Sequence, residues 1–101
     1  MIRKFAFALA AACLLAPSLP AHATGQMTCE SVERSAWLSK DQLTEKLVAD
    51  GWQVRFMKED GGCWEVYGTT PEGQRVEAYF HPSSGEKLLV SRRGEILFRK
   101  E

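Results

Sequence analysis

The side chains of this chain best suited to metal, redox or nucleophilic chemistry are its three cysteines and two histidines. Cys63 stands in the motif GGCWEVYG, directly behind two glycines, where it suits a metal ligand, a redox nucleophile or one half of a structural bridge. The Cys-x-x-Cys spacing of a thiol–disulfide redox site does not occur. The choice among these roles depends on how many of the five side chains belong to the folded protein.

Residues 1–23 have the pattern of a secretory signal. Arg3 and Lys4 provide a positive start, an apolar run follows, and Ala21-His22-Ala23 has the small-x-small pattern that a signal peptidase accepts. The apolar run of about 12 residues is too short to cross a bilayer as a helix, which disfavours a retained membrane anchor. We therefore expect cleavage after Ala23 and a periplasmic or secreted mature chain of residues 24–101.

Removing this segment changes the charge and the cysteine count. It takes two basic and no acidic side chains, so the mature chain lacks the basic surplus of a nucleic-acid-binding protein. It also takes Cys13 and His22, and the remaining Cys29, Cys63 and His81 are too few for a four-ligand zinc site. Two cysteines in an exported protein allow one intramolecular pairing, which predicts a Cys29–Cys63 disulfide. Closing a loop of about 35 residues stabilises a small domain by about 4 kcal/mol.

The remaining polar residues do not form a catalytic pattern. Ser35 and Ser39 have the context of loop or capping serines, and His81 has no obvious carboxylate partner in the sequence. Glu65 and Glu77 occur among basic residues, which favours ordinary ionised carboxylates. A chain of this length also has little room for a deep pocket. We therefore expect a protein that is not an enzyme and has no catalytic residues.

An accessory of a membrane electron-transfer, metal or haem system is the alternative function. His81, Met27 and Met57 are the side chains that could serve as axial ligands of haem or copper. Against this alternative, the sequence has no Cys-x-x-Cys-His haem-attachment motif, and Met57 fits an ordinary position on a sheet face. We therefore expect no metal and no cofactor.

Turn signals divide the mature chain into one helical and several strand patterns. We interpret residues 24–36 as an irregular segment that carries Cys29, and residues 37–101 as the folded domain. A capping box at Ser39 and Gln42, followed by apolar residues at helical spacing, predicts a helix over 40–50. The apolar period then changes to two, which predicts strands. Their turns contain glycine: Asp60-Gly61-Gly62, Pro71-Glu72-Gly73, Ser83-Ser84-Gly85 and Arg93-Gly94. The fold class is α+β, with one amphipathic helix packed on an antiparallel meander of four or five strands.

The alternation assigns the strand residues to two faces, provided that the first two hairpins have three-residue loops. The apolar face under the helix comprises Trp52, Val54, Phe56, Trp64, Val66, Val76, Ala78, Phe80, Leu88 and Val90, covered by Leu43, Leu47 and Val48. The opposite face has charged and aromatic side chains in cross-strand rows, types that support one another and are enriched at interfaces. It is the candidate binding face: Arg55, Met57, Glu65, Tyr67, Arg75, Glu77 and Tyr79. A plain solvated face is the alternative, and the edge strand is then the better candidate for binding.

The stretch of residues 37–85, together with the cysteine ahead of it, resembles the small exported proteins of the PepSY superfamily. The similarity lies in WLS before the helix, GWQVRFMK, GGCWEVYG, GQRVEAYFHP and SSGE. It implies a β-lactamase-inhibitor-protein-like fold, a helix on an antiparallel sheet, as found in metalloprotease propeptides and in periplasmic or membrane-linked proteins. Where the family usually has Asp before the proline of the last turn, this chain has His81. No catalytic motif carries over.

The resemblance and the residues together predict an exported, non-enzymatic binding module of PepSY type. Its expected role is to modulate or inhibit a protease or another partner protein in the periplasm. The expected partner is a periplasmic or membrane-associated protein and not a nucleic acid. We expect the mature chain to be a monomer or weak dimer without a transmembrane segment.

Overall fold

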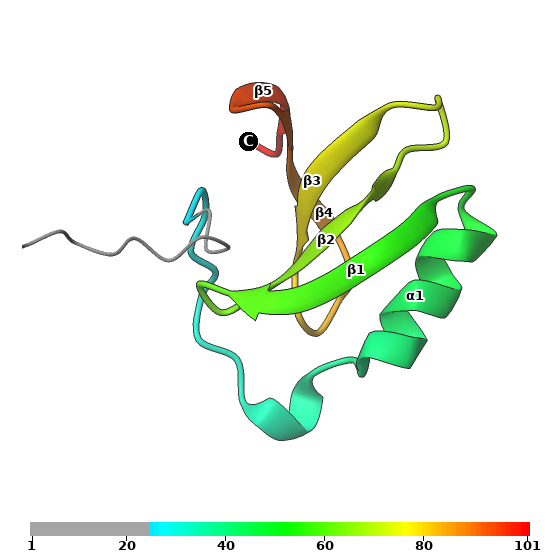
Figure 1. The fold of residues 1–101 in the computed structure, drawn as a ribbon. Coiled ribbons are helices and arrows are strands. Elements are labelled where there is room, and N and C mark those ends of the chain that lie inside the picture. Colours follow the sequence, from blue (N-terminus) through cyan, green and yellow to red (C-terminus); the bar gives the residue numbers. More distant parts are fainter. Residues whose placement is uncertain (1–24) are drawn as a thin grey trace, which may run out of the picture.

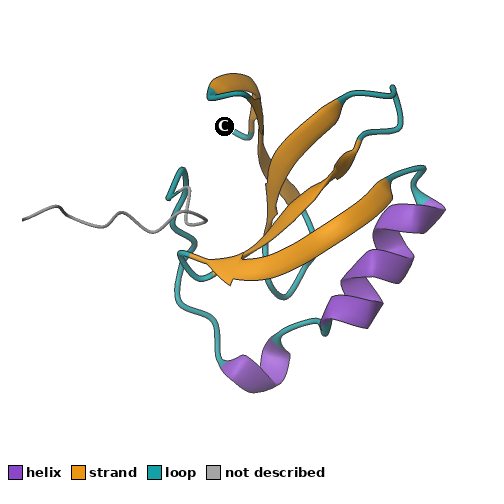
Figure 2. Ribbon diagram, in the orientation of Figure 1, coloured by secondary structure: helices purple, strands orange, loops and turns teal. Residues whose placement is uncertain are grey.

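The computed structural model describes residues 25–101, so the expected signal segment and its cleavage site lie outside the described residues. Within residues 25–101 one α-helix packs on a five-stranded antiparallel sheet, whose strands follow sequence order (Figure 1). The elements are η1 (Arg34–Ala36), α1 (Lys40–Ala49), β1 (Gln53–Asp60), β2 (Cys63–Thr69), β3 (Arg75–Phe80), β4 (Lys87–Arg92) and β5 (Glu95–Arg99). The predicted α+β class is confirmed, and the fifth strand is present. Residues 25–33 are neither helix nor strand (Figure 2).

The capping box predicted for α1 is present. Ser39 Oγ accepts from the Gln42 N–H at 3.0 Å, and Gln42 Oε1 accepts from the Ser39 N–H at 2.8 Å. Leu43 and Leu47, one turn apart, are buried against the sheet. Val48 was predicted to cover the sheet and does not, because it lies about 100° around the helix axis from Leu47 and is 56% exposed.

The main core lies between α1 and the sheet, and we call this side of the sheet the helix face. Trp52, Trp64 and Phe80 are buried there, as predicted. The rings of Trp52 and Phe80 meet edge to face at 5.5 Å, and Trp64 meets Trp37 in the same way at 5.3 Å. Trp64 Nε1 donates to the carbonyl of Leu38 at 3.0 Å, so the indole N–H is satisfied although its ring is buried.

The first hairpin has a two-residue loop and not the predicted three-residue loop. Gly61 and Gly62 have φ of 63° and 82°, the left-handed values that a tight hairpin turn requires. Asp60 therefore pairs with Cys63. The second hairpin has the expected three-residue loop, since the Thr70 N–H donates to the Gln74 carbonyl at 2.8 Å.

This shorter loop changes which side chains of β1 face the helix. Met57 pairs with Val66 and is buried in the core, although it was predicted on the opposite face. Phe56 was predicted in the core but pairs with Tyr67 and is 54% exposed. A β-bulge between Val54 and Phe56 then restores the predicted phase, so that Val54 packs against the core. The other predicted core residues of the strands are buried.

Candidate functional site: the sheet face opposite the helix

The sheet face opposite α1 is built from two cross-strand rows. One row is Lys58, Glu65, Tyr79 and Leu89, and the other is Phe56, Tyr67, Glu77 and Ser91. The rows thus include Glu65, Tyr67, Glu77 and Tyr79 of the predicted binding face. They exclude Met57, which is in the core, and Arg55, which is the extra residue of the bulge.

The N-terminal segment crosses the first row, and we call residues 25–32 the strap. The predicted Cys29–Cys63 disulfide is present and joins the strap to the start of β2. Met27 and Cys29 pack on a second, smaller core of Cys63, Tyr79 and Leu89. Tyr79 and Glu65 are consequently fully buried, so these two residues of the predicted binding face are not available at the surface.

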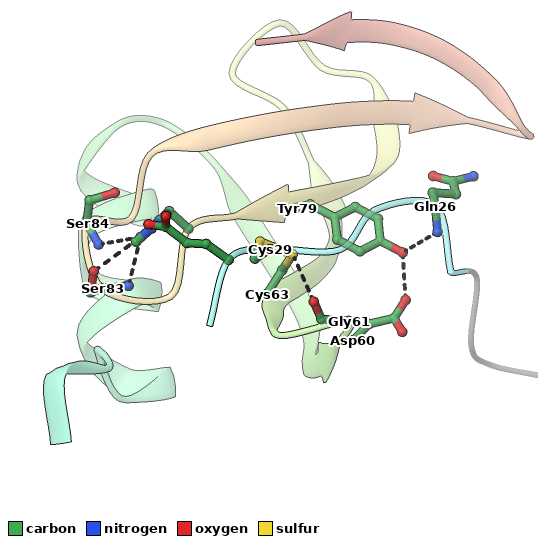
Figure 3. Close-up of a disulfide and its surroundings, with 10 residues drawn as sticks. Gln26, Cys29, Asp60, Gly61, Cys63, Tyr79, Ser83 and Ser84 are labelled. Carbon is green, nitrogen blue, oxygen red and sulfur yellow. Dashed lines mark hydrogen bonds and ion pairs between the residues drawn. A yellow bond between two sulfur atoms is a disulfide. The ribbon is translucent and has the colours of Figure 1, made fainter. Parts of the chain in front are cut away.

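Hydrogen bonds fasten the strap as well (Figure 3). The hydroxyl of Tyr79 donates to Asp60 Oδ2 at 2.7 Å and accepts from the Gln26 N–H at 3.2 Å. Asp60 Oδ2 also accepts from the Gly25 N–H at 3.0 Å, and Ser91 Oγ donates to Gln26 Oε1 at 2.7 Å. Because its ring packs under the strap and its hydroxyl holds both strap and hairpin, Tyr79 has a structural role.

Beyond the strap a smaller part of this face stays exposed, and we call Phe56, Tyr67 and Glu77 the open patch. The rings of Phe56 and Tyr67 lie 5.8 Å apart, and Lys58 Nζ is 6.0 Å from the Tyr67 ring centroid. Lys58 Nζ also lies 3.8 Å from the buried Glu65 Oε1, so a positive charge compensates this carboxylate. The open patch therefore combines the exposed ring of Phe56 and the half-buried ring of Tyr67 with neighbouring charges of both signs.

The electrostatics of the open patch reflect partial burial. Desolvation raises the pKa of Tyr67 above its usual range, and the nearby carboxyl groups of Glu65 and Glu77 raise it further. Desolvation also raises the pKa of Glu77, the charge of Lys58 lowers it, and the charge of Asp60 raises it. A side-chain hydrogen bond with Glu65 also raises the pKa of Tyr67, so its hydroxyl is neutral at physiological pH and bonded within the sheet face.

His81 has a carboxylate partner that the sequence did not indicate. Its Nε2 lies 2.9 Å from Glu30 Oε2 of the strap, and its Nδ1 lies 3.2 Å from Ser83 Oγ. Serine, histidine and glutamate in contact is the side-chain set of a hydrolytic triad. Here, however, Nδ1 already accepts from the N–H groups of Ser83 and Ser84, each at 3.2 Å, which makes it a poor base toward the Ser83 hydroxyl. The arrangement organises the turn and anchors the strap.

The three side chains considered for haem or copper do not converge. Met57 is in the core under α1, whereas Met27 packs on the opposite face of the sheet. His81 Nε2 donates to the Glu30 carboxylate, and its Nδ1 accepts from backbone N–H groups. Within residues 25–101 no three His, Cys, Asp or Glu side chains are grouped so as to hold a metal ion.

The structure thus defines a small α+β domain whose second core is closed by a disulfide-fastened strap. The chain belongs to the PepSY family described as "Peptidase propeptide and YPEB domain", whose model matches residues 5–89. Domains of this family are generally non-catalytic, propeptide- or inhibitor-like modules and are typically extracellular or periplasmic, and the disulfide fits an oxidising compartment. Compared with the curated proteins and with the solved structures, the chain has no match. None of the helices within residues 25–101 has the length and apolar character needed to cross a bilayer.

Proposed function

We propose that this protein is an exported, non-enzymatic binding module that modulates or inhibits a protease or another periplasmic partner protein through the open patch. The observation that carries the proposal is the exposed Phe56 ring, which lies against Tyr67 on a rigid sheet. Exposed aromatics on a fixed backbone lose little conformational freedom on binding and frequently supply the hot spots of an interface. The family's propeptide- and inhibitor-like character supports the same kind of role.

The strap makes this surface smaller than the sequence suggested. Tyr79 and Glu65 are buried beneath it, so direct contact with a partner involves Phe56, Tyr67 and Glu77 with the adjoining Arg75. The edge strand β5 is the second candidate, because Ile96, Leu97 and Phe98 are each at least 37% exposed. A bulge in the β4–β5 pairing and the flanking charges disfavour the addition of another strand along that edge.

The test uses the disulfide-bonded exported protein as bait for periplasmic proteins and, separately, as an inhibitor of a thermolysin-type metalloprotease. Phe56→Ser should abolish capture or inhibition, because it removes the central aromatic of the open patch. Val48→Ser is the matched control, since Val48 is exposed to the same degree on α1, at 56% against 54% for Phe56. An equal loss of capture and inhibition in both variants, or no loss in either, would reject the open patch as the binding surface. Capture without inhibition would leave a binding module that acts on another partner.

A further inference from the structure

A hollow of about 500 Å³ lies at the end of the sheet, between the β2–β3 turn and the β4–β5 turn. Its lining is rich in basic side chains and comprises Gly73, Gln74, Arg75, Val76, Glu77, Arg92 and Arg93. Arg92 and Arg93 belong to a part of the chain beyond residue 89, where the match to the family model ends. The hollow shares Glu77 with the open patch and Arg75 with its margin, but Arg92 and Arg93 lie outside both the family match and the open patch.

The sheet places these charges around one space. The last pair between β3 and β4 is Glu77 with Ser91. Beyond it Arg75 lines the hollow from β3, and Arg92 and Arg93 line it from β4 and the β4–β5 turn. Like charges that share such a space repel each other. None of the ion pairs formed within residues 25–101 includes Arg75, Arg92 or Arg93. Glu77 of the lining and Glu95, which pairs with Arg92 across the strands, thus lie near these arginines without forming an ion pair with them.

The backbone at Arg93 gives an independent indication. Arg93 and Gly94 form the two-residue loop between β4 and β5, with Arg92 paired to Glu95. Arg93 has φ of 53°, and within residues 25–101 it is the only residue other than glycine with a positive φ. Asparagine, aspartate or glycine is preferred at this position of a tight hairpin, so arginine costs stability there. Strain kept beside a charged hollow points to a ligand.

We propose that this hollow binds a ligand that carries clustered oxyanion groups, either phosphates or carboxylates. The guanidinium group is always charged and offers a planar set of donors that matches two oxygens at once. Arginines from β3, from β4 and from the β4–β5 turn surround the same space, so one ligand can replace their mutual repulsion with charge-assisted hydrogen bonds. Glu77 is the only acidic side chain of the lining and repels such a ligand, which places the ligand toward the arginines.

The experiment is a titration of the disulfide-bonded exported protein, at constant ionic strength, with tripolyphosphate and with a tetraglutamate peptide, followed by NMR. Saturable shifts at the amide and side-chain N–H groups of Arg75, Arg92 and Arg93 support the site, and the tighter probe identifies the oxyanion. Arg75→Gln should weaken binding about tenfold or more, the loss expected for a charge-assisted hydrogen bond. Glu77→Gln should strengthen binding, because it removes the repelling carboxylate.

Arg93→Asn separates ligand binding from a structural role. It should weaken binding and at the same time raise the midpoint of denaturation, because asparagine tolerates the left-handed conformation. Arg99→Gln is the matched control, since Arg99 lies on β5, is exposed and does not line the hollow. The proposal is overturned if neither probe saturates by about 10 mM. It is equally overturned if Arg99→Gln weakens binding as much as Arg75→Gln, since net charge would then explain the effect.

Discussion

At the scale of single residues, the roles of two aromatic side chains are the reverse of what the alternating pattern indicates. Phe56 is exposed on the face opposite α1, whereas Tyr79 is buried between that face and the strap. His81 shows a similar limit of the sequence. Its Nδ1 accepts two backbone N–H groups of the turn, the function that an aspartate side chain often has at such a position. The residue types thus indicated which side chains can pack or form hydrogen bonds, but the tertiary fold determined which residues they contact.

Truncating these two aromatics provides a direct test of the assignment. Tyr79→Ala removes a fully buried ring and should lower the free energy of unfolding by about 3 to 5 kcal/mol. Phe56→Ala removes a ring that is 54% exposed and should cost less than about 1 kcal/mol. Urea denaturation of both variants measures the difference. Equal losses would show that the strap does not protect Tyr79 in solution.

Glu77 should make stability depend on pH. Desolvation places its folded-state pKa above the ordinary value of 4.5, so the folded protein holds this proton more tightly than the unfolded chain. The stabilisation from the neutral carboxyl is complete below pH 4.5 and is lost as the pH rises through the raised pKa. The charged or polar groups near Glu77 are Lys58 and Asp60 of β1, Tyr67 of β2 and Ser91 of β4, and the arginines of the hollow share its lining with Glu77.

Glu77→Gln removes this loss and keeps the shape of the side chain. The variant should therefore be more stable than the natural protein at neutral pH, and the advantage should shrink as the pH falls toward 4.5. Urea midpoints of both proteins between about pH 4 and pH 7 measure the effect. An advantage that is constant across this range would show that charge at Glu77 is not its cause.

At the scale of elements, the sequence predicted which segments form helix and strands better than it predicted how they pair. The capping box at Ser39 and Gln42 is a local signal and located α1 correctly. The register of β1 depended on whether Asp60 belongs to the strand or to the loop, and local composition does not decide this. A one-residue error there exchanged Phe56 and Met57, and the bulge at Arg55 limited the error to that part of the strand. The path of the strap could not be derived, because a disulfide fixes one point of a segment and not its course.

The first hairpin and the strap should be coupled through Gly61. Its φ of 63° favours glycine, and a Cβ atom there would lie 2.3 Å from the carbonyl oxygen of Met27. Gly61→Ala should therefore lower the free energy of unfolding by more than about 1 kcal/mol, which is the cost of the left-handed conformation alone, because the strap must also move. Gly73→Ala is the control, with φ of 93° and no heavy atom within 4 Å of the new Cβ. Thermal denaturation of the two variants should show the larger loss for Gly61→Ala, and a larger loss for Gly73→Ala would contradict the close contact.

At the scale of the whole molecule, the sheet is enclosed from both sides by different means. On the helix face, α1 contributes Leu43 and Leu47 to a continuous apolar core. On the other face, the strap contributes Met27 and Cys29 to a small core and is held by a covalent bond and by hydrogen bonds. A domain of this size buries a limited fraction of its surface, so a covalent fastening supplements a core that is small on its own.

Breaking the disulfide should therefore release the strap and leave α1 packed on the sheet. Cys29→Ser with Cys63→Ser removes a constraint between residues 34 apart in sequence and should lower the free energy of unfolding by about 4 kcal/mol. Because the helix-face core does not include the strap, the sheet and α1 should stay folded under mild conditions while amide exchange accelerates in residues 25–32. Hydrogen exchange followed by mass spectrometry of peptides distinguishes these regions. If exchange accelerates equally in α1 and the strap, the two layers unfold as one unit, and the disulfide supports the whole domain rather than its outer layer.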